Sequence, residues 1–213
     1  MQSNIIKPHD KQFILINDRI NNLYNTYLFV ICPFIAQLER TDNKFPIAIL
    51  NEIRAIATHL GRLNLSNDIN VINDNLTKAE RHIKRTVLDC FKYSCLSLED
   101  NYQKFERLYR RADLSIVDNG EFLPNLTKMR IETLRSLKEA QSYEITENCS
   151  EDELFKKYEL AYNNYAEVDS YINDSMEKLE RARHKGIKND FFAIAGFAVG
   201  IIGIVFSIIS IIL

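Results

Sequence analysis

The last 23 residues of the chain, 191–213, carry no charged side chain. A helix over this segment would be about 34 Å long at about 1.5 Å per residue, which is enough to cross a bilayer with modest tilt. All 27 Lys and Arg and all 29 Asp and Glu residues come before it. The sequence therefore predicts a charged soluble part joined to one transmembrane helix, and it argues against a polytopic transporter. The alternative is a buried core helix.

Basic residues come immediately before the apolar segment and none follow it. They are Arg181, Arg183, His184, Lys185 and Lys188. Because positive charge stays on the cytoplasmic side of single spans, we expect a tail-anchored protein whose large domain faces the cytoplasm.

Five small residues recur within the apolar segment at steps of four, three, four and three: Gly196, Gly200, Gly203, Ser207 and Ser210. This spacing places them on one face of a helix, where small side chains let helix backbones approach closely. The stripe favours self-association, as a homo-oligomer or a ring of helices. Two other interpretations stay open: small residues are common in membrane spans, and such a stripe could also line a narrow water path.

The rest of the chain has only three glycines and four prolines, and its apolar residues fall at helical spacing. We therefore expect an all-α fold: a cytoplasmic helical bundle whose long C-terminal helix continues into the transmembrane helix. A kink is expected at Pro33, a turn at Asp118-Asn119-Gly120, and a capping box from Ser150 to Glu153. The expected helices cover residues 11–40, 46–63, 66–117 and 124–143, and a fifth starts at 150. The expected domains are residues 1–149, 150–189 and 190–213.

A heptad pattern runs through the fifth expected helix, with two columns of residues seven apart. The first column is Leu154, Ala161, Val168, Ser175 and Ala182, and the second is Tyr158, Tyr165, Ile172 and Leu179. Two interpretations are open: a homomeric coiled-coil stalk, or a helix that packs on its own domain.

Two segments carry polar residues that a plain bundle does not need. Arg54 and His59 lie on one expected helix, and a polar stripe at steps of three and four lies on the next: Asn75, Lys78, His82, Arg85 and Asp89. Together they could form a cationic pocket in which Arg holds a phosphate and His moves a proton, as in cleavage of RNA by its own 2′-hydroxyl. The alternative is a solvated helix face.

The Arg54-x4-His59 spacing resembles the HEPN superfamily of small all-α domains, in which such a pair forms an RNase site across a dimer. The second stripe resembles the following helix of HEPN-like bacterial defence proteins, including the membrane-bound HEPN accessory protein of type VI CRISPR systems, proposed to act as a pore. The resemblance implies that Arg54 and His59 are catalytic if the site is active, and that Lys78, His82 and Arg85 bind RNA or another ligand. Ala55 departs from the residues usual in catalytic members.

No cofactor and no metal are expected, because phosphate-binding glycine loops and Cys/His ligand spacings are missing. The four cysteines are expected to be reduced, and the net charge of −2 gives no argument for bulk nucleic-acid binding. Three hypotheses remain. The first is an effector or accessory protein of antiviral defence in the bacterial inner membrane, triggered by RNA, a nucleotide or a defence-system protein. The others are a membrane-tethered HEPN ribonuclease and a non-enzymatic tail-anchored scaffold.

Overall fold

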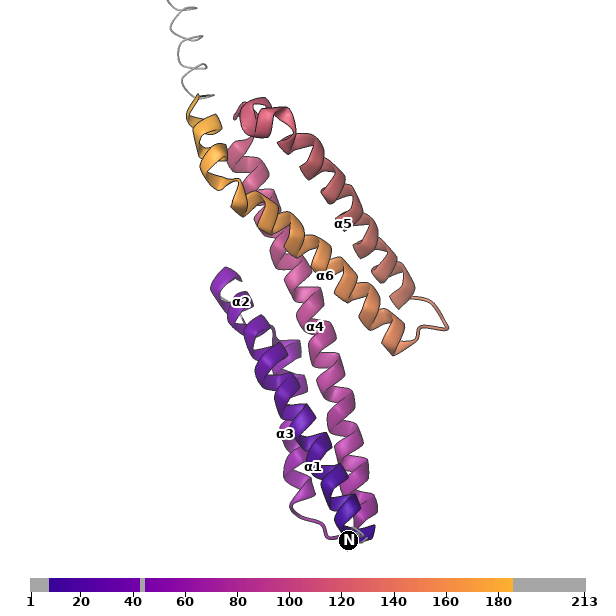
Figure 1. The fold of residues 1–213 in the computed structure, drawn as a ribbon. Helices are drawn as coiled ribbons and strands as arrows, with labels where there is room; N and C mark the ends of the chain where they lie inside the picture. Colours follow the sequence, from indigo (N-terminus) through magenta and orange to yellow (C-terminus); the bar gives the residue numbers. More distant parts are fainter. Residues whose placement is uncertain (1–7, 43–44, 186–213) are drawn as a thin grey trace, which may run out of the picture. The chain divides into compact units, whose positions relative to one another are not determined.

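The computed structural model describes residues 8–42 and 45–185, and every regular element in this part of the chain is a helix (Figure 1). The all-α prediction is thus confirmed for these residues. The elements are α1 (Pro8–Thr26), the π-helix η1 (Tyr27–Ile31), α2 (Cys32–Asp42), α3 (Ile47–Leu63), α4 (Ile69–Tyr109), the short η2 (Leu114–Gly120), α5 (Phe122–Glu144) and α6 (Glu151–Asp174).

The expected transmembrane helix and its stripe of small residues, Gly196 to Ser210, lie outside the described residues. Among the helices that are described, none combines the length and the apolarity needed to cross a bilayer.

The helices form two compact units that alternate along the sequence. The first unit contains the chain up to Ser97 together with Glu139–Tyr162, and the second contains Leu98–Lys138 and the chain from Asn163 onward. Helices α4, α5 and α6 therefore each contribute residues to both units.

In the first unit, α1 lies against α3 and α4. Leu23 of α1, Ile56 of α3 and Ile83 of α4 are all buried and line one shared groove. Phe91 of α4 gathers three further rings around it, those of Phe34, Phe155 and Tyr162, at centroid distances of 5.2 to 5.5 Å. Burial of these apolar side chains is the main stabilising contribution in this unit.

Pro33 does not break the first helix; a π-helical turn comes before it. The amide of Cys32 donates to the carbonyl of Tyr27, five residues earlier, so the turn is wider than an α-turn. In a regular helix the Pro33 ring would clash with the carbonyl four residues back, at Phe29. The wider turn accommodates the proline, and the helix continues as α2 to Asp42.

Helix α4 ends at Tyr109, eight residues before the predicted end at Val117, so that predicted boundary was wrong. The chain leaves the helix where the Ala112 amide bonds the Tyr109 carbonyl, and Asp113 caps the short turn that follows. The Asp118-Asn119-Gly120 turn is confirmed, with φ angles of +50°, +55° and +92°. Asn and Asp tolerate this left-handed conformation, and Gly adopts it without strain.

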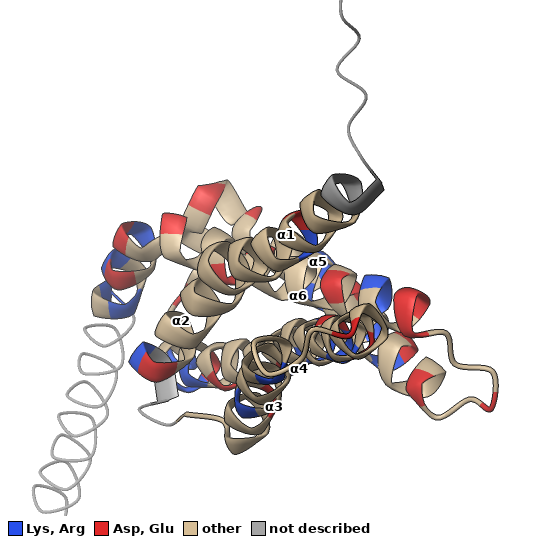
Figure 2. Ribbon diagram, turned by 90° about the horizontal axis from the view of Figure 1, so that it is seen from below, with Lys and Arg blue, Asp and Glu red and all other residues tan. Residues whose placement is uncertain are grey.

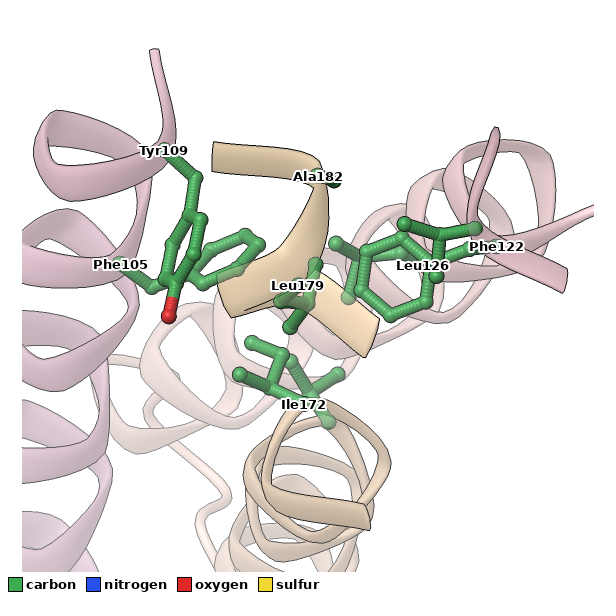
Figure 3. Packing of buried hydrophobic residues seen from close by; sticks show 9 residues of the cluster. Phe105, Tyr109, Phe122, Leu126, Ile172, Leu179 and Ala182 are labelled. Atoms are coloured by element: carbon green, nitrogen blue, oxygen red, sulfur yellow. The ribbon is translucent and has the colours of Figure 1, made fainter. Parts of the chain in front are cut away.

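The second unit has its own apolar core, which Figure 3 shows at close range. Phe105 and Tyr109 enter it from α4, and Phe122 and Leu126 enter it from α5. The remaining members come from α6 and from the helix that follows it: Val168, Ile172, Leu179 and Ala182, with Val117 from η2.

All nine residues of the heptad pattern are buried within the chain. Leu154, Tyr158 and Ala161 belong to the first unit, and the six from Tyr165 to Ala182 belong to the second. Of the two interpretations left open by the sequence, the structure has the helix packed on its own domain.

The expected uninterrupted helix from residue 150 is broken at Ser175, where the amide bonds the Ile172 carbonyl in a tight turn. A helix then resumes over residues 176–185. A seven-residue pattern drifts about 20° per heptad on a straight α-helix, so three heptads from Leu154 accumulate about 60°. The turn at Ser175 keeps Leu179 and Ala182 on the buried side.

The predicted capping box at the start of α6 does not form directly: in the described residues neither the Ser150 hydroxyl nor the Glu153 carboxylate bonds the amide of the other, and Tyr143 lies between them. The Ser150 amide donates to the hydroxyl of Tyr143 at 3.1 Å, and this hydroxyl donates to the Glu153 carboxylate at 2.8 Å. Glu153 thus reaches the Ser150 amide through the phenol of α5, a link that the sequence pattern did not reveal.

Candidate functional site

Helices α3 and α4 bring two histidines together in the first unit. The rings of His59 and His82 stack with centroids 5.4 Å apart and planes inclined by 20°. Both side chains are partly exposed. The pair joins the two segments in which the sequence placed its candidate residues.

Each imidazole is held by a hydrogen bond at Nδ1. His82 donates to Oε2 of Glu52 at 2.6 Å, and both side chains are about a quarter exposed. His59 bonds Oδ1 of Asn75 at 3.0 Å, while the Asn75 amide nitrogen donates to the Val71 carbonyl at 2.9 Å. Since Asn75 donates through its nitrogen, its oxygen accepts, and His59 is therefore the donor. In both rings Nε2 is the nitrogen that takes no part in these hydrogen bonds, so it is the atom that could contact a ligand.

Glu52 was not among the predicted site residues, although its position on α3 could have indicated it. Glu52 comes seven residues before His59, which is two turns of helix, so both side chains share one face. A carboxylate that accepts from Nδ1 fixes the orientation of the imidazole ring. Glu52, His82 and His59 therefore form one polar cluster.

Arg54 does not join the histidine pair. It lies five residues before His59, which corresponds to about 140° around the helix, and its side chain is exposed. Within one chain, then, the Arg-x4-His motif is not assembled into a site. Thr58 bonds the Arg54 carbonyl, as expected for an exposed Thr on a helix.

The other predicted ligand-binding residues, Lys78 and Arg85, share a face of α4 with His82. Lys78 pairs with Asp74 at 2.6 Å, and Arg85 lies 3.9 Å from Glu151. All four of these charged side chains are about half exposed or more. The two cations flank His82 by one turn on either side, where they can attract an anionic ligand.

Asp89, the last residue of that stripe, is half-buried. Burial is the main cause that raises the pKa of its carboxyl; Lys92 opposes the shift, and the carboxylates of Glu52 and Glu144 add to it. Asp89 is thus an acidic group with a perturbed pKa in the same unit as the histidine pair.

Arg19 on α1 forms a second polar network, which the sequence pattern did not predict. It holds both oxygens of Glu80 at 2.7 Å and also donates to Thr77 and Asn73. Asn73, Thr77 and Glu80 recur at steps of four and three on α4, a signal that could have marked this face. Arg19, the residue of α1 that binds all three, has no such spacing pattern in the sequence. Arg19 and Glu80 line a groove of about 450 Å³ whose floor includes Phe91.

Among the residues described, no group of three or more His, Cys, Asp or Glu side chains could hold a metal ion. The four cysteines are free, and burial raises the pKa of the Cys90 and Cys95 thiols to about 12. At neutral pH both thiols are therefore protonated and unreactive.

Comparison with protein-family models, with characterised proteins and with solved structures found no match. Over the described residues the structure defines an all-α protein whose two helical units alternate along the sequence. The HEPN resemblance rests on the sequence pattern alone.

Proposed function

We propose that this chain is a single-span, self-associating effector or accessory protein of bacterial antiviral defence, which perturbs the inner membrane when its cytoplasmic helices are triggered. One observation carries this proposal. Leu179 and Ala182, in the last described helix, have no exposed surface and belong to the core of the second unit. Only eight residues, 183–190, lie between Ala182 and the apolar segment.

A short connection matters because a long, flexible linker would uncouple the helical unit from the apolar segment. Gly- and Ser-rich linkers behave as random coils and transmit no displacement. Here the helix is still present at residues 183–185, directly after its last buried position. We propose that a displacement of the second unit reaches residues 191–213 through the five residues that follow Lys185.

The buried heptad also indicates where copies of the chain would associate. Because the seam from Leu154 to Ala182 is filled by the chain's own core, it is not free to pair with another copy. Self-association would then depend on the stripe of small residues in the apolar segment, among them Gly196 and Gly200.

Reconstitution of the full chain into liposomes tests the proposal. Gly200→Leu places a large side chain on the stripe, while Ala198→Leu adds one carbon fewer about 160° away on the expected helix. We expect Gly200→Leu to reduce both dye leakage and oligomer size in detergent, and Ala198→Leu to preserve both. Wild-type leakage and size in Gly200→Leu would contradict the proposal, whereas insertion without any leakage would indicate a tail-anchored scaffold.

The histidine pair supports a second candidate, a membrane-tethered ribonuclease. It would use His59 and His82 as acid and base, with Glu52 orienting His82, rather than the Arg54 and His59 pair that the motif suggests.

Comparison of single variants separates the two versions of the ribonuclease site. Loss of RNA cleavage in His82→Ala with retention in Arg54→Ala would support the histidine pair. Loss in Arg54→Ala and retention in His82→Ala would instead support a HEPN site completed by a second chain. Cleavage that survives in the double variant of Arg54 and His59 would contradict the HEPN version.

A further inference from the structure

The second unit has a basic end, formed by the last turns of α4 and by the helix over residues 176–185. Arg107 lies in the last turn of α4, and Arg110 and Arg111 directly follow its end at Tyr109; all three are exposed. In the part of the chain that the structure describes, none of the three makes an ion pair. They contribute three positive charges that no carboxylate of the described residues holds in a salt bridge.

One contact joins the end of α4 to a segment about seventy residues later: the Tyr109 hydroxyl donates to Glu180 at 2.6 Å. Hydrogen bonds from Ser115 are the main cause that lowers the pKa of the Asp113 carboxyl, and the positive charge of Lys185 adds to the shift. Figure 3 shows Tyr109 close to Leu179 and Ala182. The arginines of α4 thus lie at the end of the unit from which the chain continues to residue 191.

The acidic groups at this end are already occupied. Glu180 bonds both Tyr109 and Arg183, and Glu177 pairs with Arg181. Glu106 interacts with Tyr102, and Asp113 accepts from Ser115. Elsewhere basic and acidic residues are interspersed along the helices (Figure 2). Glu106 and Asp113 keep their negative charge, because their partners are neutral. Six basic residues nevertheless outnumber the four acidic ones named here, so this end carries a net positive charge: Arg107, Arg110, Arg111, Arg181, Arg183 and Lys185.

We propose that this basic end binds the headgroups of anionic phospholipids in the bilayer. This inference rests on the proposed membrane span of residues 191–213. Six residues from Lys185 to the span reach at most about 20 Å when fully extended, so the bilayer surface must lie within that distance of Lys185. Arginine binds phosphate in a bidentate manner, and basic residues near an anionic surface strengthen binding by about fivefold each.

The test uses the full chain in nanodiscs and measures its relative association with spin-labelled phosphatidylglycerol and phosphatidylcholine. The wild-type chain is expected to select the anionic lipid. The triple variant Arg107→Gln, Arg110→Gln, Arg111→Gln is expected to lose at least about fivefold of that selectivity. A matched variant in the first unit, Arg40→Gln, Arg62→Gln, Arg81→Gln, removes three exposed charges and is expected to keep it.

Salt provides a measurement that needs no substitution. Selectivity of the wild-type chain should disappear as ionic strength rises, because screening shortens the range of the interaction. Equal lipid selectivity in the wild type and the triple variant overturns the inference. Hydrogen exchange gives a second test: protection of the end of α4 by added RNA, but not by anionic lipid, also overturns it. If alkaline carbonate extracts the chain from membranes, the proposed span itself fails; a chain that stays inserted without lipid selectivity contradicts only the basic end.

Discussion

The hydroxyl of Tyr109 at the end of α4 donates a 2.6 Å hydrogen bond to the carboxylate of Glu180, in the last described helix. Burial, together with this carboxylate, raises the pKa of Tyr109 to about 12, so the phenol stays protonated and remains a donor at physiological pH. The same bond holds the pKa of Glu180 below its ordinary value. The two chain segments are thereby joined at the position where the chain continues toward the apolar segment.

The buried seam predicts a large cost for truncating Leu179. Its side chain is fully buried, so Leu179→Ala should lower the free energy of unfolding by about 2–5 kcal/mol. Leu160→Ala, on α6 and half exposed, should change it by only about 0.5 kcal/mol. Urea titrations followed by far-UV circular dichroism measure both. A Leu179→Ala chain of unchanged stability but smaller oligomer size would show that the seam is intermolecular.

The two described glycines predict substitutions of opposite sign. A Cβ at Gly61 meets nothing within 4 Å on α3, so Gly61→Ala should stabilise the protein by up to about 1 kcal/mol through higher helix propensity. Gly120 has a φ of +92°, and a Cβ added there would lie 3.4 Å from the Ser115 carbonyl oxygen, so Gly120→Ala should destabilise the protein by about 1 kcal/mol or more. Thermal unfolding of the two variants decides; a shift of the melting temperature in the same direction for both would contradict the difference in backbone conformation.

An ion pair in the second unit predicts a difference between two arginines of α5. Arg130 donates to Glu99 at 2.6 Å with only 12% of its side chain exposed, and its Nη1 atom is buried without a partner in the described residues. Arg130→Leu leaves the Glu99 carboxylate without its cation, with only neutral donors such as Tyr165, and should cost about 2–3 kcal/mol. Arg135, which pairs with Glu132 in solvent, should cost less than about 0.5 kcal/mol when changed to Leu. A denaturant titration measures both variants. If Arg130→Leu and Arg135→Leu lost the same unfolding free energy, burial would not explain the strength of the Arg130 ion pair.

The same ion pair sets a pH dependence. Burial opposes ionisation of Glu99, but the hydrogen bonds from Arg130 and Tyr165 outweigh it and hold the pKa of Glu99 below its ordinary value. A carboxyl with a lowered pKa stabilises the folded state above its unfolded pKa of about 4.3 and loses that contribution as the pH falls. The wild-type chain should therefore lose stability below about pH 4.3, and Glu99→Gln should lose less over the same range. If the free energy of unfolding fell in parallel with pH in the wild type and in Glu99→Gln, the role assigned to Glu99 would be contradicted.

Asp89 should behave in the opposite way, since burial raises its pKa. Folding then favours the protonated carboxyl, and this contribution is lost as the pH rises through the folded-state pKa. Asp89→Asn should accordingly be more stable than the wild type at pH 7, and the difference should shrink toward pH 4. Asp100→Asn, exposed on the same helix, is the control and should change little at either pH. A destabilised Asp89→Asn chain at pH 7 would show that the charged form is needed.

The local pattern of the chain was enough to predict most helix positions. Pro46 precedes α3, which ends at Leu63 as expected, and the left-handed turn at Gly120 follows from residue types alone. The early end of α4 was missed because the segment after Tyr109 remains compatible with helix in composition. Only the tertiary contacts of Val117 and Phe122 with the core decide where the helix stops.

The candidate site was predicted in part. Sequence spacing placed His59 and His82 on neighbouring helices, but helix geometry separates Arg54 from them, and the partners Glu52 and Arg19 depend on contacts across helices. Spacing along one helix fixes which residues share a face, and it carries no information about which face of another helix lies opposite.

By itself the sequence determined the all-α class, the charge-free segment at residues 191–213 and the heptad pattern before it, because each depends on residue type and period along one chain. Whether that heptad faces another copy or its own domain was open, since both arrangements bury the same side chains. The tertiary structure decided it: α4 and α5 supply apolar surface that covers the seam from Leu154 to Ala182, and a seam covered within the chain has no exposed apolar area left to drive association.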